Sequence, residues 1–247
     1  MSPPHTDFDA AVETAIESDP RIDREFVRVV TDGPSPVVLV GVVHDHPASI
    51  ARVEKLIDQV EPDLIAVELP DVLVPEVADP ERTFGGEMAA AVSAAPGTPA
   101  VGIDVPGQGT GRALLAAGRH RDVTLGTVVQ SVRSLGTMTA RTVSGRLARL
   151  WPSVLPSLDA LEYGHEYDLE PEASPRRQAD NELAHLHRSR SLFETFEPPP
   201  ATAFLDAVRE RQMANRIERL RQKGSVAAVV GHEHLGSVGT ALRTDEA

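Results

Sequence analysis

Two short stretches of the chain, far apart in sequence, each combine an apolar run with a pair of histidines. Residues 37–49 read VVLVGVVHDHPAS and residues 226–237 read VAAVVGHEHLGS. Each run leads into Gly-x-x-His, and a second histidine lies two positions from the motif histidine, with an acidic residue between them. Neutral imidazole is a common ligand of zinc, manganese, cobalt and iron, and carboxylates complete such sites. The first candidates for metal ligands are therefore His44, His46, His232 and His234.

Acidic side chains stand at the ends of two further apolar runs. Glu68 closes the run in PDLIAVELP, and Asp104 closes the run in AVGIDVP. A carboxylate placed there should not be buried without a cationic partner or a metal. In open α/β sheets ligands bind at the carboxyl edge of the strands, and in a locally extended chain residues two apart project to the same side. We therefore expect His44, Glu68, Asp104 and His234 to share one sheet edge, with His46 and His232 beside them.

Two imidazoles and one carboxylate leave open coordination positions on a divalent metal, where a water molecule can be acidified and used as a nucleophile. Glu68 would act either as a ligand or as the general base, and the sequence leaves both roles open. Asp45 and Glu233 separate the members of the two histidine pairs and are interpreted as solvated or supporting groups rather than ligands. A structural role is the simpler interpretation of each residue alone, so the shared placement is what favours chemistry.

A helix predicted over residues 198–223 supplies candidates for contact with the substrate. Phe204, Val208, Arg211 and Asn215 fall on one face of it. Arg211 would stabilise negative charge in a tetrahedral intermediate or hold a carboxylate, and Asn215 would orient the substrate. The alternative is that both polar side chains reach the surface as the helix leaves the core.

The elements that must position these residues alternate between strands and helices. Strands are predicted over 36–43, 63–70, 100–106 and 225–231, and helices over 47–60, 86–95 and 109–118 as well as 198–223. A strand, helix, strand unit requires a right-handed crossover and parallel pairing. The fold class is therefore α/β, a mixed and largely parallel central sheet flanked by helices. The two histidine motifs meet only if the last strand returns beside the first.

The 247 residues are expected to form a single domain, 1–247. Within it, residues 1–36 are interpreted as an N-terminal lead-in of uncertain order. Residues 122–197 are interpreted as a mostly helical and loop insertion in the middle of the chain, with loop around 152–175. His185 and His187 lie two apart on a predicted helix in this region and so face different directions.

Composition limits the classes of function. The chain has no cysteine, which excludes disulfides and thiolate metal sites. Its net charge of -13 and its use of arginine over lysine predict an acidic haloarchaeal protein and argue against nucleic-acid binding. It has no apolar run long enough for a membrane span and no signal-peptide pattern, so we expect a soluble, cytoplasmic protein. The sequence leaves open whether it is a homo-oligomer.

The ordered set of motifs resembles the TraB/PrgY/TIKI (GumN-like) family, which is related to the erythromycin-esterase/ChaN-like superfamily. The resemblance rests on Gly41-Val42-Val43-His44, on PDLIAVELP with Glu68, on GIDVP with Asp104, on the helix segment 209–214, and on Gly231-His232-Glu233-His234. Their order and spacing agree over residues 37–240. Two features depart from the family: Val105 stands where an arginine commonly follows the aspartate, and the chain ends at Ala247 without the membrane region of many prokaryotic members.

The resemblance implies an EreA/ChaN-like α/β core in which His44, Glu68 and His234 cluster, with Arg211 second in rank and Asp104 third. The TIKI branch is regarded as metal-dependent proteases that use manganese or cobalt. The PrgY/TraB branch is associated with shutting down peptide pheromones, and ChaN-like relatives are linked to haem or iron. His46 and His232 are not required by the motif.

Together these observations predict a metal-dependent hydrolase that acts on a peptide (amide) or related ester bond through a divalent metal ion, Mn, Co, Zn or Fe. The substrate would be a peptide or another small molecule. One alternative is a non-catalytic peptide-, metal- or haem-binding protein of the same fold. A second alternative is a module in which the histidines only stabilise the sheet edge.

Overall fold

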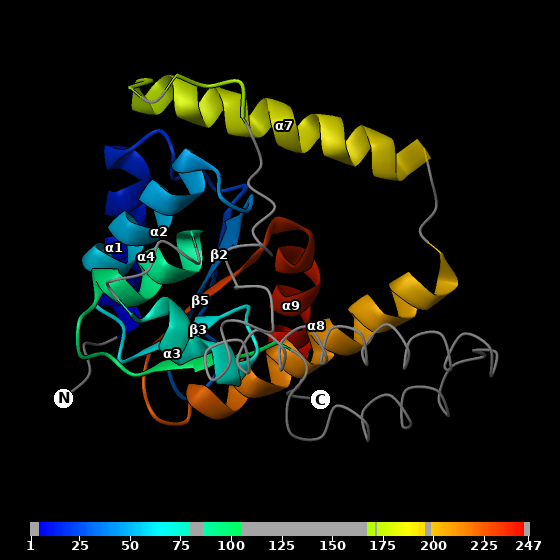
Figure 1. Ribbon diagram of the computed structural model, residues 1–247. Helices are drawn as coiled ribbons and strands as arrows, with labels where there is room; N and C mark the ends of the chain where they lie inside the picture. The colour runs from blue at the N-terminus through cyan, green and yellow to red at the C-terminus, as the bar shows by residue number, and fades with distance from the viewer. Residues whose placement is uncertain (1–4, 80–85, 105–166, 171, 196–198, 245–247) are drawn as a thin grey trace, which may run out of the picture.

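A computed structural model describes residues 5–79, 86–104, 167–170, 172–195 and 199–244 (Figure 1). Its centre is a five-stranded sheet of order β1-β2-β5-β3-β4. The strands are β1 (Val27–Val30), β2 (Val37–Val42), β3 (Leu64–Val67), β4 (Ala100–Gly102) and β5 (Val226–Gly231). Only β1 runs antiparallel to its neighbour; β2, β5, β3 and β4 are parallel. The last strand thus lies directly beside the first predicted one, as the meeting of the two histidine motifs requires.

Helices cover both faces of the sheet. They are α1 (His5–Ser18), α2 (Pro47–Val60), the 3-10 turn η1 (Asp71–Leu73), α3 (Val74–Val77), α4 (Gly86–Ala94), α7 (Pro175–Thr195), α8 (Pro200–Leu220) and α9 (His232–Thr244). Figure 1 shows α1, α2 and α4 on one side of the sheet, α8 and α9 on the other, and α7 crossing at one end. This confirms the mixed, largely parallel α/β class.

The side chains of β2 alternate between the two faces of the sheet, and each face has its own hydrophobic core. Val38 and Val40 pack with the helices α1 and α2, whereas Val37 and Leu39 pack with α8 and α9. Successive side chains of a strand point to opposite faces, so a strand covered on both faces must be apolar throughout. Every residue of β2 and β5 is buried. The continuous apolar runs in the sequence therefore follow from this double cover.

Residues 5–30, expected as part of a lead-in of uncertain order, contain α1 and β1. Phe8 and Val12 of α1 are buried in the core, and β1 adds an antiparallel edge to the sheet. The helix predicted over 109–118 lies outside the described residues, as do residues 122–166 of the predicted insertion and most of the loop predicted around 152–175. No helix in the described part of the chain is long and apolar enough to cross a bilayer.

Candidate active site

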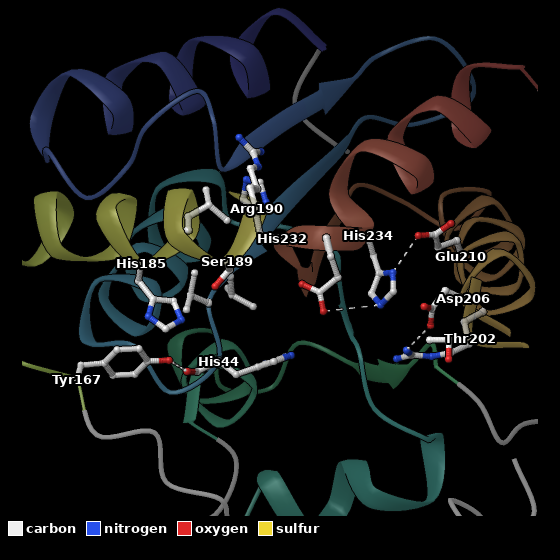
Figure 2. A pocket seen from close by; sticks show the side chains of 15 residues that line it. His44, Tyr167, His185, Ser189, Arg190, Thr202, Asp206, Glu210, His232 and His234 are labelled. Carbon is white, nitrogen blue, oxygen red and sulfur yellow. Dashed lines mark hydrogen bonds and ion pairs between the residues drawn. The ribbon is translucent and has the colours of Figure 1, made fainter. Parts of the chain in front are cut away.

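The carboxyl ends of the parallel strands bring the predicted residues to one edge. β2 leads to His44, β3 to Glu68, β4 to Asp104, and β5 runs directly into α9, which begins at His232. A pocket of about 560 Å³ opens at this edge, and its lining includes His44, Tyr167, Arg209, His232 and His234 (Figure 2). The predicted convergence of the strand ends is therefore present in the structure.

His44 is held by an acidic residue from α4. Its Nδ1 lies 2.7 Å from Oε1 of Glu87, and the other oxygen of Glu87 accepts a hydrogen bond of 3.0 Å from the backbone N–H of Asp45. The hydrogen bond to Glu87 raises the pKa of His44 to about 9 against the effect of burial, and the charges of Glu87, Glu68 and Glu233 add to it. Because Nδ1 is occupied, Nε2 is the nitrogen that a bound ion would use.

His234 repeats this arrangement with an acidic residue from α8. Its Nδ1 lies 3.0 Å from Oε1 of Glu210, and its Nε2 lies 3.5 Å from Oε1 of Glu68. Burial lowers the pKa of His234, but the hydrogen bond to Glu210 and the charge of Glu68 outweigh it, so that the net shift is upward. Both motif histidines therefore carry a carboxylate on Nδ1, which fixes the ring and the tautomer.

Arg209 is the cationic partner of the two carboxylates at the strand ends, Glu68 and Asp104. Its guanidinium binds Asp104 through two bonds, Nε to Oδ1 at 3.0 Å and Nη2 to Oδ2 at 2.9 Å, and Nη2 also lies 2.8 Å from Oε1 of Glu68. The second oxygen of Glu68 accepts from the backbone N–H of Gly231. Burial nevertheless raises the pKa of Glu68. Asp104 thus has its cationic partner on α8, although Val105 follows it in the chain.

Arg211 and Asn215 do not reach the site, because both are exposed on α8. The prediction extended the stripe of Phe204 and Val208 along the helix, but the buried face changes halfway. In the second half Met213, Ala214, Ile217 and Leu220 pack on the sheet. Residues 208 and 213 are separated by about 140° around a helix. Arg211 and Asn215 are therefore not among the residues that line the pocket, and the arginine from α8 that lines it is Arg209.

His46 and His232 also lie elsewhere than expected, because neither pair is extended. Asp45 has a left-handed backbone with φ of 59°, and His232 and His234 are in the first turn of a helix. His46 is fully buried at the start of α2, where Nδ1 accepts from the N–H of Ala48 and Nε2 contacts Asn181 at 3.1 Å. With both ring nitrogens occupied, His46 does not fit the predicted ligand role.

His232 packs at the back of the pocket. Its ring meets the Phe26 ring edge-on, with the centroids 5.1 Å apart. Burial and the charge of Arg190 lower the pKa of His232, so that the imidazole is neutral at pH 7. Its Nε2 is buried and has no hydrogen-bond partner within the described ranges. His232 therefore lines the same pocket as His44 and His234, but its ring packs against Phe26.

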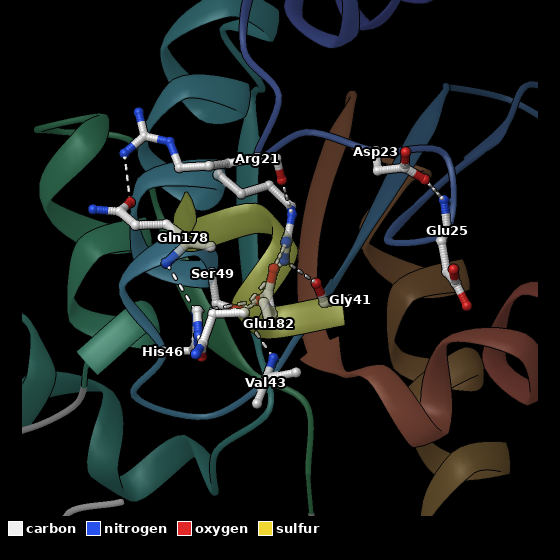
Figure 3. Close-up of polar contacts among 12 residues, drawn as sticks. Arg21, Asp23, Glu25, Gly41, Val43, His46, Ser49, Gln178 and Glu182 are labelled. Atoms are coloured by element: carbon white, nitrogen blue, oxygen red, sulfur yellow. Dashed lines mark hydrogen bonds and ion pairs between the residues drawn. The ribbon is translucent and has the colours of Figure 1, made fainter. Parts of the chain in front are cut away.

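A buried polar network joins α7 to the turn that carries His44 (Figure 3). Arg52 and Glu182 form an ion pair in which neither side chain is exposed. Arg52 also donates to the carbonyl of Gly41 at 2.9 Å, while the hydroxyl of Ser49 accepts from the N–H of Val43 at 2.8 Å and donates to Glu182. The network thus fixes the backbone just before His44.

Several residues of the site had no clear signal in the sequence. Glu87 and Glu210 lie on predicted helices, where an acidic residue is ordinarily solvated. Glu233 was interpreted as solvated or supporting; it is 65% exposed, lines the pocket, and has Oε1 4.0 Å from Nε2 of His234.

Tyr167 donates to the carbonyl of His44, and its ring meets those of His46 and His185 edge-on. For Arg209 and Glu210, the sequence offered one indication of a role in the site, because both lie in the helix segment 209–214 that contributes to the family resemblance.

The donor set can be tested against a divalent metal. No group of three or more histidine, aspartate or glutamate side chains in the described segments is placed to hold an ion as it stands. Two of the predicted donors, His234 and Glu68, nevertheless have a suitable spacing, because two atoms bonded at about 2.1 Å to a tetrahedral ion are roughly 3.4 Å apart. The observed separation of His234 Nε2 and Glu68 Oε1 is 3.5 Å. Glu68 would then share its oxygen between the ion and Arg209.

Comparisons with protein-family models, with curated proteins and with solved structures each find no match for this chain. The resemblance to the TraB/PrgY/TIKI family and the EreA/ChaN-like fold therefore remain predictions based on the motifs.

Proposed function

We propose that this protein is a metal-dependent hydrolase that cleaves a peptide (amide) or related ester bond in the pocket at the carboxyl ends of β2, β3 and β5. The observation that carries the proposal is the matched pair of motif histidines. His44 and His234 each have Nδ1 bound to a carboxylate, and both line the pocket that opens beside Glu68. Metal-ligating histidines characteristically have such carboxylate partners.

His44, Glu68 and His234 would hold the ion, with manganese, cobalt, zinc or iron as the candidates. A bound divalent ion polarises a carbonyl group and lowers the pKa of water. The local charge suits a cation, since Arg209 is outnumbered by the carboxylates of Glu68, Asp104, Asp206, Glu210 and Glu233. This excess of negative charge offsets the repulsion that Arg209 would exert on the ion.

The chain's own residues would orient the site and move protons. Glu87 and Glu210 hold the two imidazoles with Nε2 as the ligating atom, and Arg209 holds Glu68 in place. Glu233 reaches both solvent and pocket and could carry a proton between the reacting group and bulk water. Val42, Val43 and Leu186 contribute an apolar part of the pocket lining.

Metal content tests the first half of this proposal. The chelator-stripped protein would be incubated with each metal in turn, desalted, and analysed by mass spectrometry together with thermal melting. We expect near-stoichiometric uptake by the native chain, and loss of uptake in His44→Ala, His234→Ala and Glu68→Gln. His187→Ala is the matched control, because His187 is exposed on α7 and does not line the pocket. A ligand at a hundred times its Kd should add about 2.7 kcal/mol to the free energy of unfolding.

Turnover tests the second half. The metal-loaded protein would be screened against short peptides and esters, with product detected by mass spectrometry. Cleavage by the native chain and not by Glu68→Gln would support the hydrolase. A chain that takes up no metal and shows no change in melting temperature would contradict the metal mechanism. Metal uptake without cleavage would instead favour the non-catalytic binding protein.

A further inference from the structure

We infer that Tyr167 is a positioning residue for the candidate ligand His44. Its hydroxyl holds the peptide group between His44 and Asp45 in the orientation that places the imidazole at the pocket, and it thereby sets the affinity of the site for a metal ion. The part of the inference that concerns metal affinity rests on the proposed function, whereas the part that concerns the peptide group does not. Tyr167 lines the pocket from the segment before α7, 123 positions after His44 in the chain.

The peptide group between His44 and Asp45 is bound at both ends. Its carbonyl oxygen, which belongs to His44, accepts a hydrogen bond from the hydroxyl of Tyr167 (Figure 2). Its N–H, which belongs to Asp45, donates to Oε2 of Glu87 at 3.0 Å. The C=O and N–H of a trans peptide point in opposite directions, so rotation of this group would break both hydrogen bonds. The two partners come from α4 and from the segment before α7, on either side of the peptide group.

The backbone at this peptide group needs such support. Asp45 has φ of 59°, in the left-handed region that is unfavourable for a residue with a Cβ. Conformations of this kind persist where the surrounding contacts hold them. The side chain of His44 is 49% exposed in the turn after β2, whereas that of His234 is 4% exposed in the first turn of α9. Of the two motif histidines, His44 is therefore the one whose position depends more on a few polar contacts.

Tyr167 is itself held in place and can serve as an anchor. Its ring meets the rings of His46 and His185 edge-on, with centroid distances of 4.5 and 5.3 Å. Asn181 of α7 donates to the carbonyl of Asp168, the next residue, at 3.1 Å, and its Oδ1 lies 3.1 Å from Nε2 of His46. The segment that carries Tyr167 is thus joined to the turn after β2 both by its ring and through α7.

The phenol of Tyr167 is protonated at neutral pH and well above it. Burial raises the pKa of Tyr167 to about 12, and nearby carboxylates add to the shift. Only the protonated phenol can donate to a carbonyl oxygen. The hydrogen bond to His44 is therefore present over the whole range in which metal binding would be measured.

Amide hydrogen exchange of the chelator-stripped protein tests the hold on the peptide group. Tyr167→Phe removes the hydroxyl and keeps the ring. The N–H of Asp45 should exchange about two- to tenfold faster in this variant, the factor expected for the loss of one neutral hydrogen bond. The N–H of Val43 should be unaffected, because it is bound to the hydroxyl of Ser49. Equal exchange at Asp45 in the variant and the native chain would overturn the inference.

Metal affinity tests the consequence for the site. The stripped protein would be titrated with zinc alone, in competition with a chromophoric chelator. Tyr167→Phe should bind zinc at least about tenfold more weakly, as is typical when a group that orients a ligand is removed. The matched control is Thr14→Val, which removes a hydroxyl that donates to the carbonyl of Ala10 at 2.8 Å on α1, away from the pocket lining. Native zinc affinity in Tyr167→Phe would overturn the inference. So would an equal loss in Thr14→Val, because the loss would then follow general stability.

The two proposals fail in different ways. If the native chain takes up no metal but Asp45 exchanges faster in Tyr167→Phe, the hydrolase is refuted and Tyr167 stands as the residue that holds the peptide group. If the native chain binds zinc and cleaves peptides while Tyr167→Phe changes neither the exchange nor the zinc affinity, the positioning role is refuted and the hydrolase stands.

Discussion

Removal of the negative charge of Glu182 tests how α7 is attached to the core. The ion pair between Arg52 and Glu182 is fully buried, and Glu182→Gln leaves the guanidinium without its partner while the side chain keeps its size. Breaking one half of a buried pair costs about 3–5 kcal/mol of the free energy of unfolding. In a chain of this length such a loss lowers the melting temperature by roughly 6–20 °C.

Urea unfolding followed by circular dichroism measures this change, and two further variants calibrate it. Asp180→Asn removes an ion pair with Arg176 on the same helix, in which the side chains are 58% and 75% exposed, so less than about 0.5 kcal/mol should be lost. Arg52→Met combined with Glu182→Leu removes both buried charges and should recover much of the stability lost in Glu182→Gln. A loss below about 1 kcal/mol in Glu182→Gln would refute the reasoning, because the pair would then not hold α7.

The same variant should loosen the turn that precedes His44. Glu182 accepts from Ser49, whose hydroxyl in turn accepts from the N–H of Val43. Amide hydrogen exchange at Val43 should therefore become faster in Glu182→Gln and stay unchanged in Asp180→Asn. Unchanged exchange in both variants would show that the turn is held independently of α7.

Two further predictions concern the site itself. Nuclear magnetic resonance should give His44 a titration midpoint of about 9, and Glu87→Gln should move it toward 6.5. Because the folded pKa is raised, Glu87→Gln should lose stability in full below about pH 6.5, and the loss should fade as the pH rises through 9. Arg209→Lys should lower the free energy of unfolding by about 2 kcal/mol, since lysine lacks the fork that binds Asp104, whereas Arg211→Lys should change it by less than about 0.5 kcal/mol. A midpoint near 6.5 in the native chain, or equal losses at Arg209 and Arg211, would contradict these assignments.

Strand ends could be predicted from sequence because the strands are apolar throughout. A run such as residues 37–42, buried on both faces, stops where a polar residue must reach the sheet edge, and this placed His44, Glu68 and Asp104. The first edge strand was missed for the opposite reason. Val27–Val30 has the mixed burial of a strand at the border of a sheet, and so short a run resembles a loop.

The partners of the site residues could not be predicted because they depend on how helices pack. Arg209 rather than Arg211 enters the site, since the buried face of α8 changes between Val208 and Met213. The apolar spacing of Met213, Ala214, Ile217 and Leu220 marks the second face in the sequence, but the prediction extended the stripe of Phe204 and Val208 instead. His232 and His234 diverge for a similar reason, because α9 starts without any loop after β5 and a helix replaces the extended geometry that was expected.

The two motif histidines come from neighbouring parallel strands, but the carboxylates that orient them come from helices on opposite faces of the sheet. Glu87 lies on α4 and Glu210 on α8. The relative position of the two Nε2 atoms therefore depends on the packing of both helical layers, and not on the sheet alone. If the protein binds metal as proposed, a core substitution under α4 or α8 that shifts either helix should weaken that binding even where it leaves both histidines in place. Stability and metal affinity should thus be coupled more strongly at these helices than at α1, which contributes no residue to the pocket lining.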